Sequence, residues 1–89
     1  MRKETSISVS LVINEKVIDL QIPIQVTVNR LKKLIKEALT NLGISVPATF
    51  KLVVSNKPIL LEDIYRLSDY PVGNGDQFMI QEILEEKSI

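Results

Sequence analysis

The chain has 89 residues, which is enough for one hydrophobic core and predicts a single domain. It contains no cysteine and no histidine, so disulfides, thiolate metal sites and the common nucleophile–base pairs are excluded, and we expect neither catalysis nor a cofactor. Its 11 basic residues balance 11 acidic ones and only 4% of its residues are aromatic, a composition that argues against nucleic acid as a partner.

The N-terminal part of the chain predicts an antiparallel hairpin. In residues 6–13, isoleucine, valine and leucine recur at every second position, the period that is typical of a half-buried strand. Residues 17–22 repeat the pattern, and a short polar turn, Asn14 to Lys16, joins the two strands. Pro23 cannot donate a backbone hydrogen bond, so the second strand ends there or lies at an edge of the sheet.

An amphipathic helix follows the hairpin. Thr27 stands at the N-cap position, and Gly43 can adopt the left-handed conformation that ends a helix. Between them the apolar residues recur at intervals of three and four and form one stripe: Val28, Leu31, Ile35, Ala38, Leu39 and Leu42. We expect this stripe to face the core.

The rest of the chain predicts two further strands, at residues 50–54 and 77–83, while 59–61 is long enough for only a short one. Leu67 and Tyr70, in the polar segment before the last strand, are expected to plug the core. One helix, with two strands before it and two or three after it, predicts an α+β fold. In that fold a mixed sheet of four to five strands is covered on one face by the helix.

The segment Arg66 to Tyr70, placed just before the last strand, resembles the signature turn of ubiquitin-like β-grasp domains. Within that group the chain resembles the YukD/EsaB proteins of type VII secretion systems. The similarity lies in residues 56–61, 66–70 and Gly75-Asp76, and in the absence of a terminal Gly-Gly. It covers residues 5–83, which we expect to form the domain, with flexible ends at 1–4 and 84–89. From the fold we also infer that the first and last strands pair in parallel at the sheet centre.

The resemblance implies a cytoplasmic accessory protein without catalysis, which contacts a protein component of the secretion system and supports export of small helical substrates. No apolar run approaches the roughly 20 residues that span a bilayer, so we expect no direct membrane insertion. One alternative is a ubiquitin-like modifier or sulfur carrier, which the lack of any Gly-Gly pair disfavours. Another is an isolated copy of a domain that is otherwise fused to a membrane transporter.

Ubiquitin-like domains usually bind partners through the sheet face that is turned away from the helix. Carried over to this chain, the candidate partner-binding residues on that face are Val12, Lys51, Val53, Met79 and Gln81. The same face could also bury against a second copy, which leaves a homodimer open. The rival surface is a basic ridge on the helix, which we call the helix ridge and which comprises Arg30, Lys32, Lys33 and Lys36.

Overall fold

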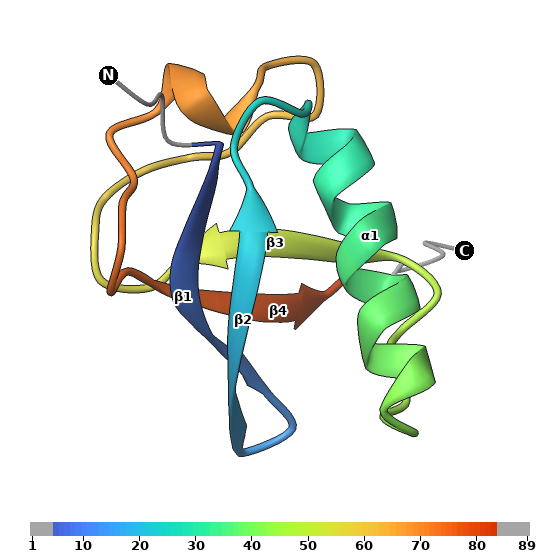
Figure 1. Ribbon diagram of the computed structural model, residues 1–89. Helices are drawn as coiled ribbons and strands as arrows, with labels where there is room; N and C mark the ends of the chain where they lie inside the picture. Colours follow the sequence, from blue (N-terminus) through green and yellow to red (C-terminus); the bar gives the residue numbers. More distant parts are fainter. Residues whose placement is uncertain (1–4, 84–89) are drawn as a thin grey trace.

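Four strands form one mixed sheet, and a single α-helix covers one of its faces (Figure 1). The computed structural model describes residues 5–83. Its elements, in chain order, are β1 (Ser6–Ile13), β2 (Lys16–Pro23), α1 (Val28–Asn41), β3 (Phe50–Val54), a 3₁₀ turn (Leu67–Asp69) and β4 (Gln77–Glu82). This confirms the ubiquitin-like α+β arrangement predicted from the sequence. The expected ends at 1–4 and 84–89 lie outside the described residues.

The β1–β2 hairpin closes through a turn of two residues. Asn14 and Glu15 both adopt left-handed backbone conformations, with φ of 48° and 66°, which match the right-handed twist of the strands. The strands pair over their whole length, from Ile13 opposite Lys16 to Ser6 opposite Pro23. The turn therefore fixes the register, and with it the face on which every side chain of the hairpin lies.

The strand order is β2-β1-β4-β3, which places β1 and β4 at the centre and leaves β2 and β3 as edges. Strands β1 and β4 run parallel, as predicted, and β3 pairs with β4 in the antiparallel sense. The two central strands come from opposite ends of the described chain. Their pairing therefore holds both ends of the domain in one sheet.

Helix α1 begins and ends with the predicted caps. The Oγ1 atom of Thr27 accepts a hydrogen bond from the N–H of Arg30 at 3.2 Å. At the other end Gly43 has a φ of 77°, and its N–H donates to the carbonyl of Thr40 while the N–H of Ile44 donates to that of Leu39. These two bonds form a Schellman motif, which satisfies carbonyls that the helix end would otherwise leave unpaired.

The buried stripe of α1 is shorter than predicted. Val28, Leu31, Ile35 and Leu39 are buried, whereas Leu42 is 62% exposed. The prediction for Leu42 assumed helical geometry up to that residue, but the helix ends at Asn41. The chain then turns at Gly43 and returns Ile44 to the core, in the hydrophobic contact that commonly accompanies this cap.

The core lies between α1 and the inner face of the sheet. Its sheet side consists of the alternate residues of β1 together with β3 and β4 residues: Ile7, Val9, Leu11, Ile13, Leu52, Val54 and Phe78. Leu67, from the 3₁₀ turn, is fully buried, and Tyr70 is half-buried with its hydroxyl accepting the N–H of Glu62 at 2.9 Å. Leu67 therefore plugs the core as predicted, whereas Tyr70 is not among the residues packed against the core.

Residues 59–61 do not form the predicted short strand. Ile59 and Leu61 pack against the core, while Leu60 is 76% exposed. The alternation is that of a strand, but the backbone bonds locally, from the N–H of Ile59 to the carbonyl of Lys57 at 2.8 Å. The sheet therefore has four strands. Strand β4 ends at Glu82, one residue before the predicted end.

Candidate protein-interaction surface

The outer face of the sheet, which α1 does not cover, carries a continuous row of apolar side chains. Val53 lies opposite Met79 across β3 and β4, and Met79 lies opposite Val12 across β4 and β1. Val12 in turn lies opposite Val17 across β1 and β2. Paired residues share a sheet face. We call Val17, Val12, Met79 and Val53 the apolar row, which crosses all four strands.

The row is accessible to solvent and flanked by polar residues. Val12, Met79 and Val53 are half-buried, and Val17 is 63% exposed. On one side lie Ser10 and Asp19, whose side chains share a hydrogen bond. Because the neighbouring rows are polar, the exposed apolar surface of this face is confined to one narrow strip.

The predicted site residues lie close together on this face. Val12, Val53 and Met79 are direct neighbours in the apolar row, and Lys51 lies opposite Gln81 at exposed positions one row away. Sequence analysis missed Val17, although the hairpin register would have revealed it. Once the two-residue turn at Asn14 and Glu15 is recognised, residues 12 and 17 must pair.

Asp76 is a buried carboxylate, a feature that is common at functional sites, and the sequence analysis did not single it out. The residue is 5% exposed, and its side chain accepts hydrogen bonds from three donors. These are Asn56 Nδ2 at 3.1 Å, Lys57 Nζ at 2.9 Å and the N–H of Gly73 at 2.9 Å. Lys57 also donates to the carbonyl of Pro71, and Asn56 accepts the N–H of Gln77.

The hydrogen bonds to Asp76 outweigh the effect of its burial on ionisation. Burial by itself raises the pKa of this carboxyl, whereas the bonds from Gly73, Lys57 and Asn56 and the charge of Lys57 lower it. The net pKa of Asp76 lies below its ordinary value, so the group is a carboxylate at neutral pH. Its donors join the turn that follows β3 to the turn that precedes β4, which gives Asp76 a structural role.

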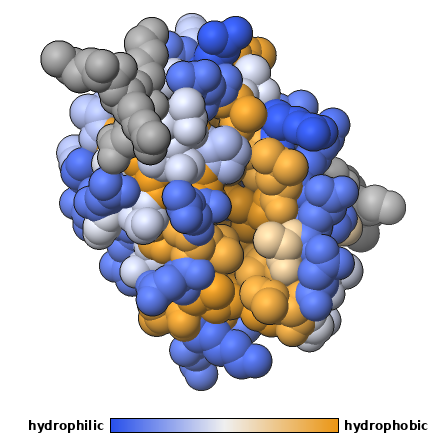
Figure 2. Space-filling model, viewed as in Figure 1, coloured by the Kyte–Doolittle hydropathy of each residue, from blue (hydrophilic) through white to orange (hydrophobic). Residues whose placement is uncertain are grey.

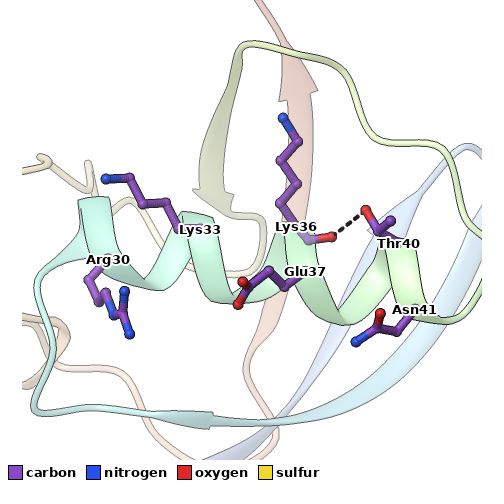
Figure 3. A pocket seen from close by; sticks show the side chains of 6 residues that line it. All are labelled: Arg30, Lys33, Lys36, Glu37, Thr40 and Asn41. Atoms are coloured by element: carbon purple, nitrogen blue, oxygen red, sulfur yellow. Dashed lines mark hydrogen bonds between the residues drawn. The ribbon is translucent and has the colours of Figure 1, made fainter.

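The helix ridge is divided between different sides of α1. In Figure 3 the side chains of Lys33 and Lys36 extend from one side of the helix, and that of Arg30 extends from another, near Glu37. Lys32 forms an ion pair with Asp63 at 2.9 Å. The hollow drawn in Figure 3 is lined by residues of α1 itself, so it is a shallow surface rather than an enclosed cavity.

Neither a membrane-crossing helix nor a metal-binding cluster is found within residues 5–83. Helix α1 has 14 residues, and nothing in this range is both long and apolar enough to cross a bilayer. The described Asp and Glu residues do not gather in groups of three that could hold a metal ion.

The arrangement of sheet and helix is that of ubiquitin-like proteins. The structure is similar to the ubiquitin of Caldiarchaeum subterraneum, with a TM-score of 0.62 and 16% identity over 91% of this chain and 99% of that one. It is equally similar to a chain from a structure described as molecular mimicry of SUMO that promotes DNA repair. That match has a TM-score of 0.63 and 22% identity over 89% of this chain and 94% of the other. The chain thus has the ubiquitin-like fold.

Its family within that class is also defined. Residues 6–80 match the family described as protein YukD of the WXG100 protein secretion system, and the chain belongs to this family. An uncharacterised protein of Clostridium acetobutylicum is 30% identical over 74 residues, which cover 83% of this chain and 80% of that protein.

A further structural neighbour is part of a much longer chain. It comes from a structure of the ESX-5 inner membrane complex, with a TM-score of 0.63 and 18% identity. The match covers 97% of this chain but 24% of that chain. The likeness therefore concerns one ubiquitin-like part of a larger protein, and it extends the evidence on the fold.

Proposed function

We propose that the chain is a non-catalytic docking protein of the WXG100 secretion system, which acts in the cytoplasm and supports export of small helical substrates. Membership of the YukD family supports the link to this system. The proposal of a docking role rests on the apolar row, because a strip of aliphatic side chains on a sheet face that no helix covers is available to another protein.

The composition of the outer face favours a transient contact. Burying a valine or methionine side chain contributes about 1.5–3 kcal/mol, so a row of four supplies a real but small apolar centre. Polar rows and Lys51 surround this centre, as in the rim of a non-obligate interface. We infer that the partner is a protein component of the secretion system that carries a matching apolar strip.

The absence of catalysis is part of this proposal. The chain has no histidine or cysteine, and its most buried carboxylate, Asp76, is fully engaged with structural donors. Asp69 likewise caps the 3₁₀ turn by accepting the N–H of Arg66 at 3.0 Å. These carboxylates therefore support the fold.

Deleting the gene tests the proposed role in export. We expect the deletion strain to synthesise WXG100-type proteins at normal levels but to release less of them into the medium, with release restored by a plasmid copy. Immunoblots of cell and medium fractions provide the measurement. Normal release in the deletion strain would show that the chain is not required for export.

A further inference from the structure

Strand β2 lies at an edge of the sheet, and one side of its backbone is unpaired within the described part of the chain. It pairs with β1 over eight positions. Within residues 5–83, no backbone hydrogen bond joins residues 17–22 to a segment other than β1. A straight edge of this length is a template on which another strand can pair.

The hairpin turn determines which groups of β2 face outward. A two-residue turn is closed by a hydrogen-bonded pair, here Ile13 and Lys16, and such pairs alternate with non-bonded ones along an antiparallel ladder. The even-numbered residues of β2 therefore bond to β1. Val17, Asp19 and Gln21 direct their N–H and carbonyl groups away from the sheet, and these groups are available to an incoming strand.

An apolar band borders this edge on its inner side. Figure 2 shows the band between the β2 side of the sheet and α1, with hydrophilic residues along the helix beside it. On β2 the half-buried residues Ile18 and Leu20 face the core side. In Figure 3 the side of α1 from which Arg30 extends is turned toward β2. Leu34 and Ala38 are half-buried and follow Arg30 at intervals of four, so they lie along this side.

We propose that β2 and the adjoining side of α1 bind an extended peptide segment of another protein, which adds to the sheet as a fifth strand. The peptide backbone bonds to the outward groups of Val17, Asp19 and Gln21. Every second side chain of the peptide then lies over Leu34 and Ala38, so the site selects segments with aliphatic residues at alternate positions. This site goes beyond the proposed docking function and does not depend on it.

The other edge of the sheet is less suited to strand addition. Strand β3 has five residues, and the hollow of about 380 Å³ beside it is walled by the segment 59–63 as well as by Lys51 and Val53. An incoming strand would meet this segment. Strand β2 has eight residues and only its last, Pro23, lacks an N–H, so the longer edge is also the less obstructed one.

Two registers in which β2 could pair with β2 of a second copy each meet a conflict in the sequence of the strand. In a symmetric antiparallel pair, the side chains of the outer face stay on one face of the joined sheet only if the twofold axis passes between a residue and its own copy. Centred on Asp19, it sets two carboxylates directly opposite each other, which is destabilising. Centred on Leu20, it sets Val17 opposite Pro23, which has no N–H to donate. A partner of different sequence avoids both conflicts.

A titration followed by nuclear magnetic resonance tests the proposal. The probe is a short synthetic peptide of alternating valine and threonine with a lysine at each end. We expect the largest amide shift changes at residues 17–22 and at Leu34 and Ala38, with little change in β3. The same peptide with alternate backbone nitrogens methylated keeps its side chains but cannot pair with the edge. It should bind at least about tenfold more weakly, as expected for the loss of backbone hydrogen bonds.

A matched pair of protein variants removes one outward donor without breaking the β1 ladder. Gln21→Pro lacks the outward N–H, whereas Gln21→Thr retains it. Both variants remove the hydrogen bond from the side chain of Gln21 to that of Ser6. We expect Gln21→Pro to weaken binding about tenfold and Gln21→Thr to bind as the wild type does. Thermal melts check that both variants are folded. If Gln21→Pro is not folded, the comparison of the methylated with the unmethylated peptide tests the proposal.

Three outcomes would overturn the proposal. They are equal binding of the methylated peptide, shift changes confined to Val12, Met79 and Val53 or to the helix ridge, and unchanged binding by folded Gln21→Pro. Sedimentation of the protein alone adds a fourth. A dimer of the wild type that Gln21→Pro abolishes would assign the edge of β2 to a second copy instead of a peptide.

Discussion

Asp76 shows how one buried carboxylate can join segments that lie far apart in sequence. Its donors Asn56 and Lys57 precede it by 20 and 19 residues. They belong to the stretch 56–61 on which the resemblance to YukD/EsaB proteins was based. The structure thus gives these residues a physical role, because they join the turn after β3 to the turn before β4.

We predict that Asp76→Asn lowers the free energy of unfolding by about 1–3 kcal/mol at neutral pH, because donors remain that an amide nitrogen cannot satisfy. Since folding lowers the pKa of Asp76, its ionised form stabilises the protein above the ordinary aspartate pKa of about 3.9. This contribution is lost as pH falls through the lower pKa of the folded state. Urea titrations of the wild type and Asp76→Asn from pH 7 to about pH 2 should therefore show that their difference in free energy of unfolding becomes smaller in acid.

The control is Asp69→Asn, at an exposed carboxylate that also accepts a backbone N–H. A smaller effect is expected there because water replaces the lost acceptor. A difference between wild type and Asp76→Asn that stays constant down to the lowest pH would contradict the assignment of a lowered pKa to Asp76.

At the scale of elements, the cap of α1 depends on backbone conformation at Gly43. This residue has a φ of 77°, and no atom lies within 4 Å of the position that a Cβ would occupy. Gly43→Ala should therefore cost about 1–2 kcal/mol through backbone strain alone. Gly73→Ala provides the matched control, since Gly73 also has open space but no left-handed φ. Equal stability of Gly43→Ala and wild type in thermal melts would contradict the described cap.

The buried face of α1 gives a second prediction at this scale. Leu31→Ala should cost about 2–5 kcal/mol in free energy of unfolding, because Leu31 is fully buried between helix and sheet. Leu42→Ala removes the same atoms from a side chain that is 62% exposed and should cost less than about 1 kcal/mol. Chemical denaturation measures the loss in free energy of unfolding for both variants. An equal loss for Leu42→Ala and Leu31→Ala would show that Leu42 is buried after all.

Local patterns predicted the elements well wherever periodicity and caps agreed. The alternation in β1, the stripe of α1 and the caps Thr27 and Gly43 each indicated the observed structure. The sequence left open whether 59–61 forms a fifth strand, because alternation alone does not show whether a partner strand is adjacent. Leu42 was placed wrongly because the chain leaves the helix one residue earlier than the stripe suggests.

For the candidate site, the sequence indicated on which face of the sheet a side chain lies, but it indicated less well which residues are neighbours across the strands. Val53 and Met79 could be placed together because β3 and β4 are the last two strands and their faces follow from alternation. Val17 was missed because its neighbour Val12 depends on the conformation of a two-residue turn. Asp76 was missed because its burial results from long-range donors that no local pattern reveals.

At the scale of the whole molecule, the sheet offers two surfaces with different chemistry. The outer face carries the apolar row, which is available to a side-chain contact. The edge of β2 carries free backbone groups beside an apolar band, which are available to strand addition. The two surfaces meet at Val17, whose side chain belongs to the apolar row and whose backbone belongs to the edge of β2.

The central claim is that the apolar row on the outer face mediates the role in export. We predict that Val53→Asp and Met79→Asp each abolish restoration of export in a deletion strain, because a carboxylate in the row opposes burial against an apolar partner. Both proteins should remain folded, since neither side chain belongs to the buried core. Ser8→Asp, at an exposed position of β1 on the same face, should restore export and serves as the matched control.

The rival surface is tested in the same assay with the double variant Lys33→Glu and Lys36→Glu, which reverses charge on the helix ridge at two exposed positions. The decisive measurement is the amount of a WXG100-type protein in the medium of each strain, relative to the amount in its cells. Our account predicts loss of export for the two apolar-row variants and normal export for Ser8→Asp and for the helix-ridge variant. Normal export by folded Val53→Asp and Met79→Asp proteins would contradict it.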